Sequence, residues 1–564
     1  MSLERELWKA ATEGDLMKVK LLLQHEEIYV NWKDEEHERT AFYRACSHGQ
    51  LEVVKEMMKD PRVDVNAQTN EGATPFYIAC QIGELSIINE LLQNEKVDVN
   101  CVDIDGATPF YISSFNGFTN IVKLLLSSDK IDLNQAENEG ATPLYISCQE
   151  GHLEIISLLL NDPRVFLNKY DIEKTTPFNI ACYNGNVNVV KLLLSNKDID
   201  VNFPDSNQMS PFYLACQEGH LETVKLLLTD PRIDINFAEI DGYSPIFIAC
   251  QEGHINIVEL LLKQPQINLD QLISDGTNLF QHTCYSGQLE IVKLLLEDPR
   301  ISVTDSNISG ATAFFLSCFD GHLDILKLLM TDPRIDVTKP NNENTSPFYL
   351  ACEKGHLDVV KLMLNDKRID INSPRNDKAT PIFISSQNGH LDVVKCILAG
   401  EREVDLETKF DDGISAIEQA HAEGHYEIVE LLKSYQKDSS LTRFQLQKQF
   451  KIPRKISFLS FYFILFYFKF FFYFTIDRKA SKLFSLIVLF SDGYYSLQND
   501  QIHQHINFVK FLNIISNLPQ ELQMLISIRA FGLNNEFIPC RLVNNSLNLM
   551  LNDSPMEPDV LFIE

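Results

Sequence analysis

Positive charge is scarce over most of this chain. The first 435 residues hold 36 Lys and Arg against 68 Asp and Glu, a formal charge of −32, whereas the remaining residues carry +3. A surface with such a field repels phosphate backbones, which argues against a nucleic acid as the partner. The same field attracts basic proteins and speeds their encounter at low salt.

The common signatures of catalysis and export are missing as well. The sequence has no GxxxxGK[ST] loop, no HExxH, no GxSxG and no protein-kinase set, so nothing in it supports an enzyme. We predict a non-catalytic protein with no cofactor and no bound metal. The chain opens on the charged stretch MSLERELWKAATEGD and not on an apolar signal peptide. Its twelve cysteines are therefore predicted to be thiols in a reducing, cytoplasmic compartment.

What the sequence does contain is a long internal repeat. One glycine recurs at intervals of 34 residues, and two more extend the series at its ends with an interval of 35, which makes thirteen units. The series comprises Gly14, Gly49, Gly83, Gly117, Gly151, Gly185, Gly219, Gly253, Gly287, Gly321, Gly355, Gly389 and Gly424.

Each unit is predicted to be a pair of short helices. In the unit GATPLYISCQEGHLEIISLLLNDPRVFLNK, Thr142 is placed to cap a helix from about residue 143 to residue 149, with Pro143 at its first position. Gly151 is expected to end that helix with a left-handed backbone. A second helix is predicted over residues 152–160, with an apolar stripe of Leu153, Ile156, Leu159 and Leu160. Since one unit cannot bury its apolar face alone, neighbours must stack.

These units resemble ankyrin repeats. The family motif T-P-L-H-x-A appears as Thr74-Pro75-Phe76-Tyr77-Ile78-Ala79, and its D-V-N ending appears as Asp64-Val65-Asn66. The motif histidine is replaced in most units by Tyr or Phe, and a D-P-R turn often stands where a glycine usually closes the second helix. The unit 274–307 departs most, with Asn278-Leu279 in place of Thr-Pro. The resemblance covers roughly residues 1–436 and implies an all-α solenoid of about 12–13 helix-turn-helix units that binds other proteins.

Two repeated side chains invite a metal or catalytic interpretation, which their spacing disfavours. Nine cysteines, from Cys46 to Cys352, recur in register, one thiol to a unit, and not in the CxxC or mixed Cys/His spacing of a metal site. We predict that they are small buried hydrophobes. Six histidines, from His152 to His390, follow the turn glycine, where a structural role at the start of the second helix is expected.

The resemblance also implies a binding surface, because ankyrin arrays usually bind with hairpin tips and with the exposed side of the first helices. The residues just before each turn glycine are expected on that side. Exposed aromatic residues among them favour binding, since aromatics dominate interaction hot spots. The predicted partner-binding residues are Gln81, Phe115, Asn116, Gln149, Glu150, Tyr183, Gln217, Glu218, Gln251, Glu252, Tyr285, Phe319, Asp320, Glu353 and Gln387.

The C-terminal quarter follows a different pattern. Residues 437–455 are predicted to be a basic linker. Residues 456–476, ISFLSFYFILFYFKFFFYFTI, are long enough to span a bilayer, with Lys469 as their one charge. Their Phe- and Tyr-rich composition is equally that of translated A/T-rich noncoding sequence. Both interpretations stay open, as does a buried core segment. Residues 477–564 are predicted to be a small helical region.

The domain organisation expected from the sequence is therefore an N-terminal capping repeat over residues 1–34, eleven repeats over 35–409 and a C-terminal capping repeat over 410–436. The predicted function is a monomeric protein-interaction scaffold. One alternative is a membrane-tethered adaptor with its repeats in the cytosol. Another is a substrate-recruiting subunit of a ubiquitin ligase, because Leu518-Pro519-Gln520-Glu521-Leu522 resembles the opening of an F-box.

Overall fold

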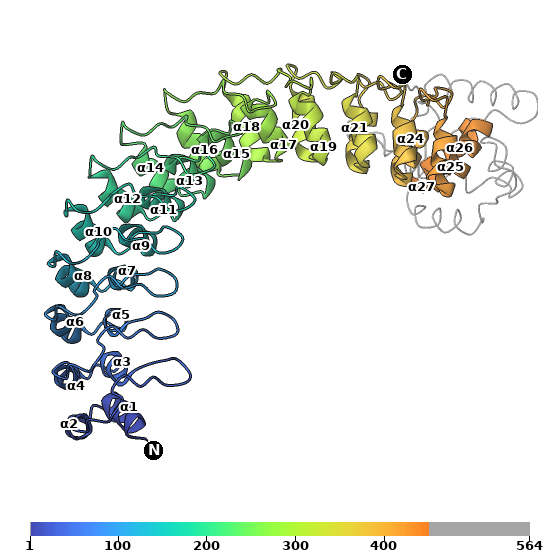
Figure 1. Ribbon diagram of the computed structural model, residues 1–564. Helices are drawn as coiled ribbons and strands as arrows, with labels where there is room; N and C mark the ends of the chain where they lie inside the picture. The colour runs from blue at the N-terminus through green and yellow to red at the C-terminus, as the bar shows by residue number, and fades with distance from the viewer. Residues whose placement is uncertain (1, 451–564) are drawn as a thin grey trace, which may run out of the picture. The chain divides into compact units, whose positions relative to one another are not determined.

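The computed structural model describes residues 2–450, and within this range it contains 27 α-helices and no β-strand. The helices α1 to α26 form thirteen consecutive pairs, each made of a first and a second helix joined at the turn glycine. Within residues 1–381 the pairs stack side by side, so that first helices pack on first helices (Figure 1). This arrangement confirms the predicted all-α solenoid.

The first helices of the units are short, between seven and eleven residues. They are α1 (Leu3–Glu13), α3 (Ala41–Ser47), α5 (Pro75–Ile82), α7 (Pro109–Phe115), α9 (Pro143–Glu150), α11 (Pro177–Tyr183), α13 (Pro211–Gln217), α15 (Pro245–Gln251), α17 (Leu279–Tyr285), α19 (Ala313–Asp320), α21 (Pro347–Lys354), α23 (Pro381–Gln387) and α25 (Ala416–Ala422).

The second helices follow directly after the turn glycines. They are α2 (Leu16–Leu23), α4 (Leu51–Met57), α6 (Leu85–Leu92), α8 (Thr119–Leu126), α10 (Leu153–Leu160), α12 (Val187–Leu194), α14 (Leu221–Leu227), α16 (Ile255–Leu262), α18 (Leu289–Glu297), α20 (Leu323–Thr331), α22 (Leu357–Leu364), α24 (Leu391–Ala399) and α26 (Tyr426–Lys437). One further helix, α27 (Ser439–Phe450), follows the last pair.

The first helices begin at the caps that the sequence predicts. The hydroxyl of Thr142 accepts the N–H of Tyr145 at 3.1 Å, and Pro143 occupies the first helical position. The divergent unit 274–307 is capped differently, because Asn278 and Gln281 satisfy each other's backbone N–H groups in a capping box. A polar pair thus replaces the Thr-Pro start in this unit.

The backbone of the turn and of the second helix is as predicted, but the buried face of the second helix differs from the predicted one. Gly151 has φ +80°, the left-handed conformation expected there. The buried residues of α10 are Ile155, Ile156 and Leu159, whereas Leu153 is 39% exposed. The predicted stripe was therefore wrong for Leu153, which lies roughly 100° around the helix from the centre of the buried face.

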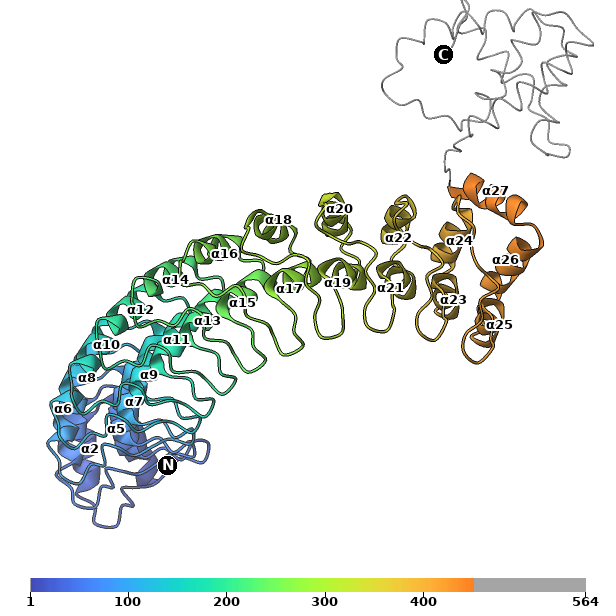
Figure 2. The same cartoon turned by 90° about the horizontal axis from the view of Figure 1, so that it is seen from above.

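Hairpin loops precede the first helices and project together from one side of the array over residues 1–381 (Figures 1 and 2). In the loop at Ile104, the N–H of Asp103 donates to the carbonyl of Ala107, and Gly106 takes a positive φ of 79°. The N–H of Ile104 donates to the carbonyl of Glu71 in the preceding loop, at 2.8 Å. Each loop is therefore tied to its neighbour at its top.

The asparagine of the D-V-N ending joins consecutive units. The side chain of Asn66 donates to the carbonyl of Lys96 at 2.7 Å and accepts the N–H of Asp98 at 2.8 Å. Both partners belong to the next unit, 30 and 32 residues later. The same two bonds recur at Asn100 and Asn202. This amide satisfies backbone groups that no regular secondary structure pairs.

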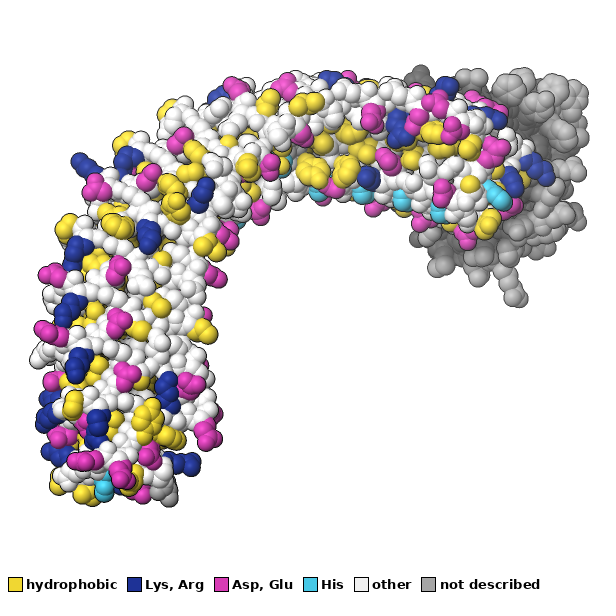
Figure 3. Space-filling model, in the orientation of Figure 1, with side chains coloured by type: hydrophobic (Ala, Val, Ile, Leu, Met, Phe, Trp, Pro, Cys, Tyr) yellow, Lys and Arg dark blue, Asp and Glu magenta, His cyan; other side chains and the backbone are white. Residues whose placement is uncertain are grey.

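The exposed faces of the second helices carry charges of both signs. Lysines pair with acidic residues three positions earlier, as in Lys225 with Glu222 at 2.6 Å and Lys293 with Glu290 at 2.6 Å. Figure 3 shows basic and acidic side chains interspersed on the side of the second helices. Exposed pairs of this kind contribute only a few tenths of a kcal/mol each. Their main effect is on solubility.

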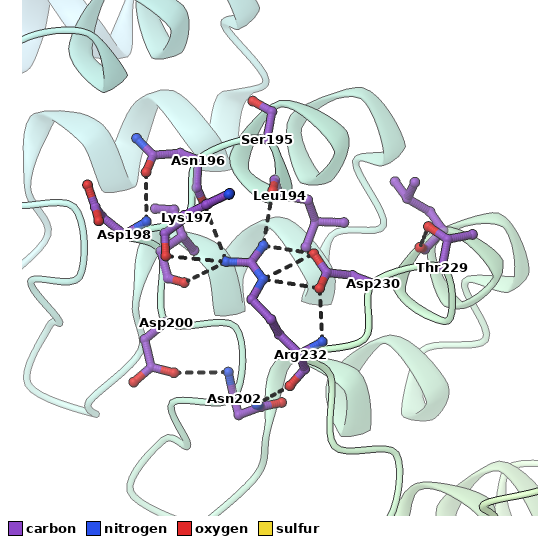
Figure 4. Close-up of polar contacts among 12 residues, drawn as sticks. Leu194, Ser195, Asn196, Lys197, Asp198, Asp200, Asn202, Thr229, Asp230 and Arg232 are labelled. Carbon is purple, nitrogen blue, oxygen red and sulfur yellow. Dashed lines mark hydrogen bonds and ion pairs between the residues drawn. The ribbon is translucent and has the colours of Figure 1, made fainter.

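The D-P-R turn contributes a second link between units, through its arginine. Arg232 is held by Asp230 and reaches back to the end of α12, where its guanidinium donates to the carbonyl of Leu194 (Figure 4). Arg62, Arg164, Arg300, Arg334 and Arg368 make the equivalent bond to the end of the preceding second helix. Each arginine thus places a positive charge and at least one hydrogen-bond donor at a helix C-terminus.

The chain divides into two compact units, residues 1–381 and residues 382–564. In the described part of the second unit, α27 packs on α24 and α26. Gln447 donates to the carbonyl of Ala399 at 2.9 Å, and Leu446 is buried. Where a linker was predicted over residues 437–455, the structure therefore has a packed helix from Ser439 to Phe450. Its apolar positions are few, which is why composition alone indicated a linker.

The predictions for the C-terminal quarter lie outside the described residues. These are the candidate membrane segment 456–476, the helical region 477–564 and the F-box-like stretch at Leu518. Within residues 2–450, no helix combines the length and apolar composition that a bilayer crossing requires.

Candidate functional site

Fourteen of the fifteen predicted partner-binding residues lie in residues 1–381, at the C-terminal ends of successive first helices from α5 to α21. We call this set, from Gln81 to Glu353, the helix-end row. The fifteenth, Gln387, ends α23 in the second unit. Because the first helices pack on one another in order, the row follows the array unit by unit.

The four aromatic side chains of the helix-end row are exposed, as predicted. Their exposed fractions are 40% for Phe115, 45% for Tyr183, 40% for Tyr285 and 38% for Phe319. Side chains of this size that are accessible but partly supported suit recognition, because they offer a large contact area and lose little conformational freedom on binding.

The histidines after the turn glycines fix the backbone beneath this row. The Nε2 of His152 lies 2.8 Å from the carbonyl oxygen of Phe115, in the preceding unit, and can donate to it. His220 contacts the carbonyl of Tyr183 in the same way, and His322 that of Tyr285. The predicted structural role of these histidines is confirmed. Each one satisfies a carbonyl at a helix C-terminus and so holds a residue of the row in place.

Between α15 and α21 the row becomes a connected aromatic surface. The ring of Tyr285 lies 6.2 Å from that of Phe319, and the ammonium of Lys354 lies 4.1 Å from the centre of the Phe319 ring. His282 extends the cluster on the other side, 6.4 Å from Tyr285 and 5.1 Å from Tyr243. Contacts of this kind orient the rings and reduce the entropy lost when a partner binds.

His282 is the buried member of this cluster. Its Nε2 lies 3.1 Å from Oε1 of Gln251, so that neutral imidazole can donate to the amide. Burial lowers the pKa of His282 to about 4, although the nearby Asp275 opposes the shift. The imidazole is therefore neutral at physiological pH, and it contributes to this surface by packing and hydrogen bonding.

Some predicted residues have a structural role that the sequence did not reveal. The side chain of Asn116 donates to the carbonyl of Gln81 at 3.1 Å. Gln251 holds His282 and also donates to Glu252 at 3.1 Å. Substitution of either residue would change the array as well as its surface. They are poorer probes of binding than Tyr285 or Phe319.

The acidic residues of the helix-end row give its surface a negative electrostatic potential. Glu150, Glu218, Glu252 and Asp320 are exposed, and in the described part of the chain none of them forms an ion pair. Lys354 adds a positive charge at one end of the aromatic cluster. The row therefore combines accessible aromatic rings with unneutralised carboxylates, a composition that complements basic and apolar groups.

Metal binding and thiol chemistry find no support in the described residues. The nine cysteines in register are fully buried, as predicted, and burial raises the pKa of the eight thiols from Cys46 to Cys318, to about 12 for Cys80. No cluster of three or more His, Cys, Asp or Glu in residues 2–450 is arranged to hold a metal ion. A small pocket between α24, α26 and α27 is lined by Leu391, Leu431 and Leu446 among others, and none of the predicted partner-binding residues lines it.

Three members of the aromatic cluster are not among the predicted partner-binding residues. Tyr243 directly precedes the cap residue Ser244, and His282 lies inside a first helix. Lys354 directly precedes a turn glycine, on the side of the first helix where binding was expected, but its stacking on Phe319 depends on a ring 35 positions earlier. The sequence does contain a signal for all three. At each of these positions of the repeat, the other units have a residue of a different type.

Comparison with known proteins agrees with this architecture. A family model described as ankyrin repeats, in three copies, matches residues 7–103, 76–171, 162–239, 231–307, 279–375 and 368–443. No curated protein matches the sequence. Ankyrin repeats are generally modules of protein–protein interaction. The matched stretches overlap from residue 7 to residue 443, and the chain therefore belongs to the ankyrin-repeat family.

Proposed function

We propose that this protein is a non-catalytic scaffold that binds a basic protein partner through the helix-end row. The observation that supports it best is the aromatic surface of Tyr285 and Phe319, which is exposed and held in place by His322 and Lys354. Truncation of such an anchor typically costs binding about 2 kcal/mol or more.

The charge distribution supports a basic partner. The repeats carry a formal charge of −32 through residue 435, and exposed carboxylates border the aromatic surface at Glu252 and Asp320. Complementary charge at the rim of an interface affects the association rate and the choice of partner more than the affinity. Binding is therefore expected to weaken with added salt and to depend on the aromatic rings at every salt concentration.

The test uses the full-length chain as bait, since α27 packs on the last units and a bait cut at residue 436 would remove it. Partners captured from a lysate by the wild type are quantified by mass spectrometry against the variant Tyr285→Ala with Phe319→Ala. We expect the main partner to fall at least tenfold while helical content, measured by circular dichroism, stays unchanged.

A matched control replaces an exposed aromatic residue outside the row. Phe166 is 62% exposed and follows the D-P-R turn of its unit. Phe166→Ala should capture the same partner at the wild-type level. Full capture by the double variant would refute the assignment, and loss of helical content in it would show that the two rings belong to the core.

A further inference from the structure

The tops of the hairpin loops in residues 1–381 show a second regularity, with a period of two units. We call the residue whose N–H bonds the preceding loop the crest residue. Isoleucine stands at every second crest, at Ile104, Ile172, Ile240 and Ile308. The crests between and beside them are polar and comprise Asn70, Asn138, Ser206, Ser274, Asn342 and Asn376.

The four crest isoleucines are among the most exposed large apolar side chains of the described residues. Their exposed fractions are 68% for Ile104, 72% for Ile172, 71% for Ile240 and 71% for Ile308. β-Branched apolar residues are uncommon at turn tops, which favour Gly, Asn, Asp and Ser. Isolated apolar residues on a surface require no explanation, but four at a constant interval of 68 positions do.

Packing within the array does not require isoleucine at these positions. At Gly276 an added Cβ would lie 2.9 Å from Cγ1 of Ile308, so this isoleucine covers the preceding glycine. Asn138 fills the same place over Gly106, and Asn342 over Gly310. These asparagines also donate to the carbonyl of the preceding crest, Asn138 to Ile104 at 3.0 Å and Asn342 to Ile308 at 2.8 Å. Asparagine thus suits the fold at least as well.

The crests are also held in a fixed row. A backbone N–H···O=C bond joins each crest residue to the loop before it, and the set runs from Asn70 bonding His37 to Asn376 bonding Glu343, with lengths between 2.8 and 3.3 Å. Because every bond spans one unit, the isoleucines cannot move independently of the polar crests between them. The apolar groups therefore form an ordered array, already arranged before any partner binds.

Carboxylates accompany the crests. The residue after the crest is acidic and exposed at Glu71, Asp105, Glu139, Glu173, Asp241, Asp275 and Glu343. Within the described residues none of these seven carboxylates forms an ion pair, and only that of Asp275 accepts a backbone hydrogen bond, from the N–H of Thr277. Figure 3 shows acidic side chains along the edge formed by the loops. A row of carboxylates with one in most units attracts a regularly spaced set of basic groups.

We propose that the crest row binds an extended, basic polypeptide segment whose apolar side chains recur at every sixth residue. Packed helices lie about 8–10 Å apart, so two units span roughly 16–20 Å. An extended chain advances about 3.3 Å per residue and covers that distance in five or six residues. Six is required, because side chains alternate between the two faces of an extended chain and only an even interval keeps the apolar ones on one face.

A second copy of this chain is disfavoured as the occupant. Its own crest row would match in spacing, but two acidic rows would face each other. The inference goes beyond the proposed function, since the crests are distinct from the helix-end row, and the test is designed to separate the two.

The experiment measures binding of two fluorescein-labelled peptides to the full-length chain by anisotropy at about 0.15 M salt. Both peptides contain 24 residues made of Lys, Ser and four Leu, with the leucines at every sixth position in one and at every fifth position in the other. We expect the six-spaced peptide to bind at least tenfold tighter. Equal affinities, or no binding of either peptide, would overturn the inference.

The variant that tests the crests is Ile104→Asn, Ile172→Asn, Ile240→Asn and Ile308→Asn together. Asparagine is the residue that this chain uses at equivalent crests, so the fold and its melting temperature should be kept. The variant should bind both peptides with the same affinity, equal to that of the wild type for the five-spaced peptide. Retention of the tenfold preference would refute the role of the isoleucines.

Two controls separate the crests from other surfaces. Phe166→Asn removes an equally exposed apolar side chain elsewhere and should leave the preference unchanged. Tyr285→Ala with Phe319→Ala should also leave it unchanged. If the preference disappears in that double variant and survives in the crest variant, the peptide binds the helix-end row, the crest inference fails and the proposed function stands.

Discussion

The guanidinium Nη2 of Arg232 lies 3.0 Å from the carbonyl oxygen of Leu194, 38 residues earlier in the chain. Leu194 is the last residue of α12, so its carbonyl has no partner within that helix. Asp230 orients the guanidinium through three hydrogen bonds of 3.1, 3.2 and 2.7 Å (Figure 4). The guanidinium in turn lowers the pKa of Asp230 through these bonds. The contact joins the turn of one unit to the helix end of the unit before it.

Loss of this contact should destabilise the array. Arg232→Lys keeps the charge but lacks the planar fork that engages both the carboxylate and the carbonyl. We expect a loss of about 1–3 kcal/mol in the free energy of unfolding, because a helix-end carbonyl and Asp230 both lose a charged donor. Urea unfolding followed by circular dichroism measures it. Lys225→Ala, which breaks the exposed pair with Glu222, is the control and should cost less than about 0.5 kcal/mol.

The turn glycines should differ in how much a side chain costs. At Gly151 the nearest atom to an added Cβ is 4.0 Å away, so Gly151→Ala imposes only left-handed backbone strain, about 1–2 kcal/mol, and Gly151→Val about 1–3 kcal/mol. At Gly219 the added Cβ would lie 2.5 Å from the ring of His254. Gly219→Ala should therefore lower the melting temperature more than Gly151→Ala does.

The pair Gly219→Ala with His254→Ala checks this explanation. Removal of the ring relieves the clash, so the double variant should lose less stability than the sum of the two single variants. Simple additivity would contradict a steric cause, and an unchanged melting curve for Gly151→Val would contradict the left-handed turn.

Stability should depend on pH through His282. Its pKa is about 4 in the folded protein against 6.5 for the free side chain. The unfolded chain therefore takes up a proton below pH 6.5 that the folded chain refuses, and stability present above pH 6.5 is lost as the pH falls toward 4. Between pH 7 and pH 5 the wild type should lose up to about 2 kcal/mol more than His282→Gln, measured by urea unfolding at both pH values. A wild-type dependence of stability on pH in His282→Gln would contradict this assignment to His282.

The backbone of the repeats could be predicted from sequence because its signals are local. Thr142, Pro143 and Gly151 cap, start and end one helix within ten residues, and each acts through the backbone next to it. The buried stripe on α10 was predicted wrongly at Leu153, because the choice between Leu153 and Ile155 depends on which neighbouring helices cover the second helix. The packed helix after residue 438 was missed for a related reason. Its few buried side chains find their partners on α24, some 48 positions away for Gln447 and Ala399.

The positions of the candidate residues in the fold could be predicted from the sequence, whereas the contacts among their side chains could not. The repeat register alone places Tyr285 and Phe319 at the ends of first helices, where they are exposed. Register does not show that Lys354 stacks on Phe319, nor that Gln251 supports His282, because both contacts depend on side-chain direction across a unit boundary. The roles of Arg232 and of the crest isoleucines likewise depend on contacts with groups in another unit.

The hydrogen bonds between units have a consequence for how this gene can change. They join residues 30, 32, 33, 37 and 38 positions apart, as at Asn66, Ile104, His152 and Arg232. Insertion of one residue within a unit shifts all of these partners at once, whereas duplication or deletion of a whole block of 34 residues restores every bond with a new neighbour. This array therefore changes length with the least disturbance in whole units. At the crests the increment is larger, because only the gain or loss of two units preserves the alternation of isoleucine and polar residues.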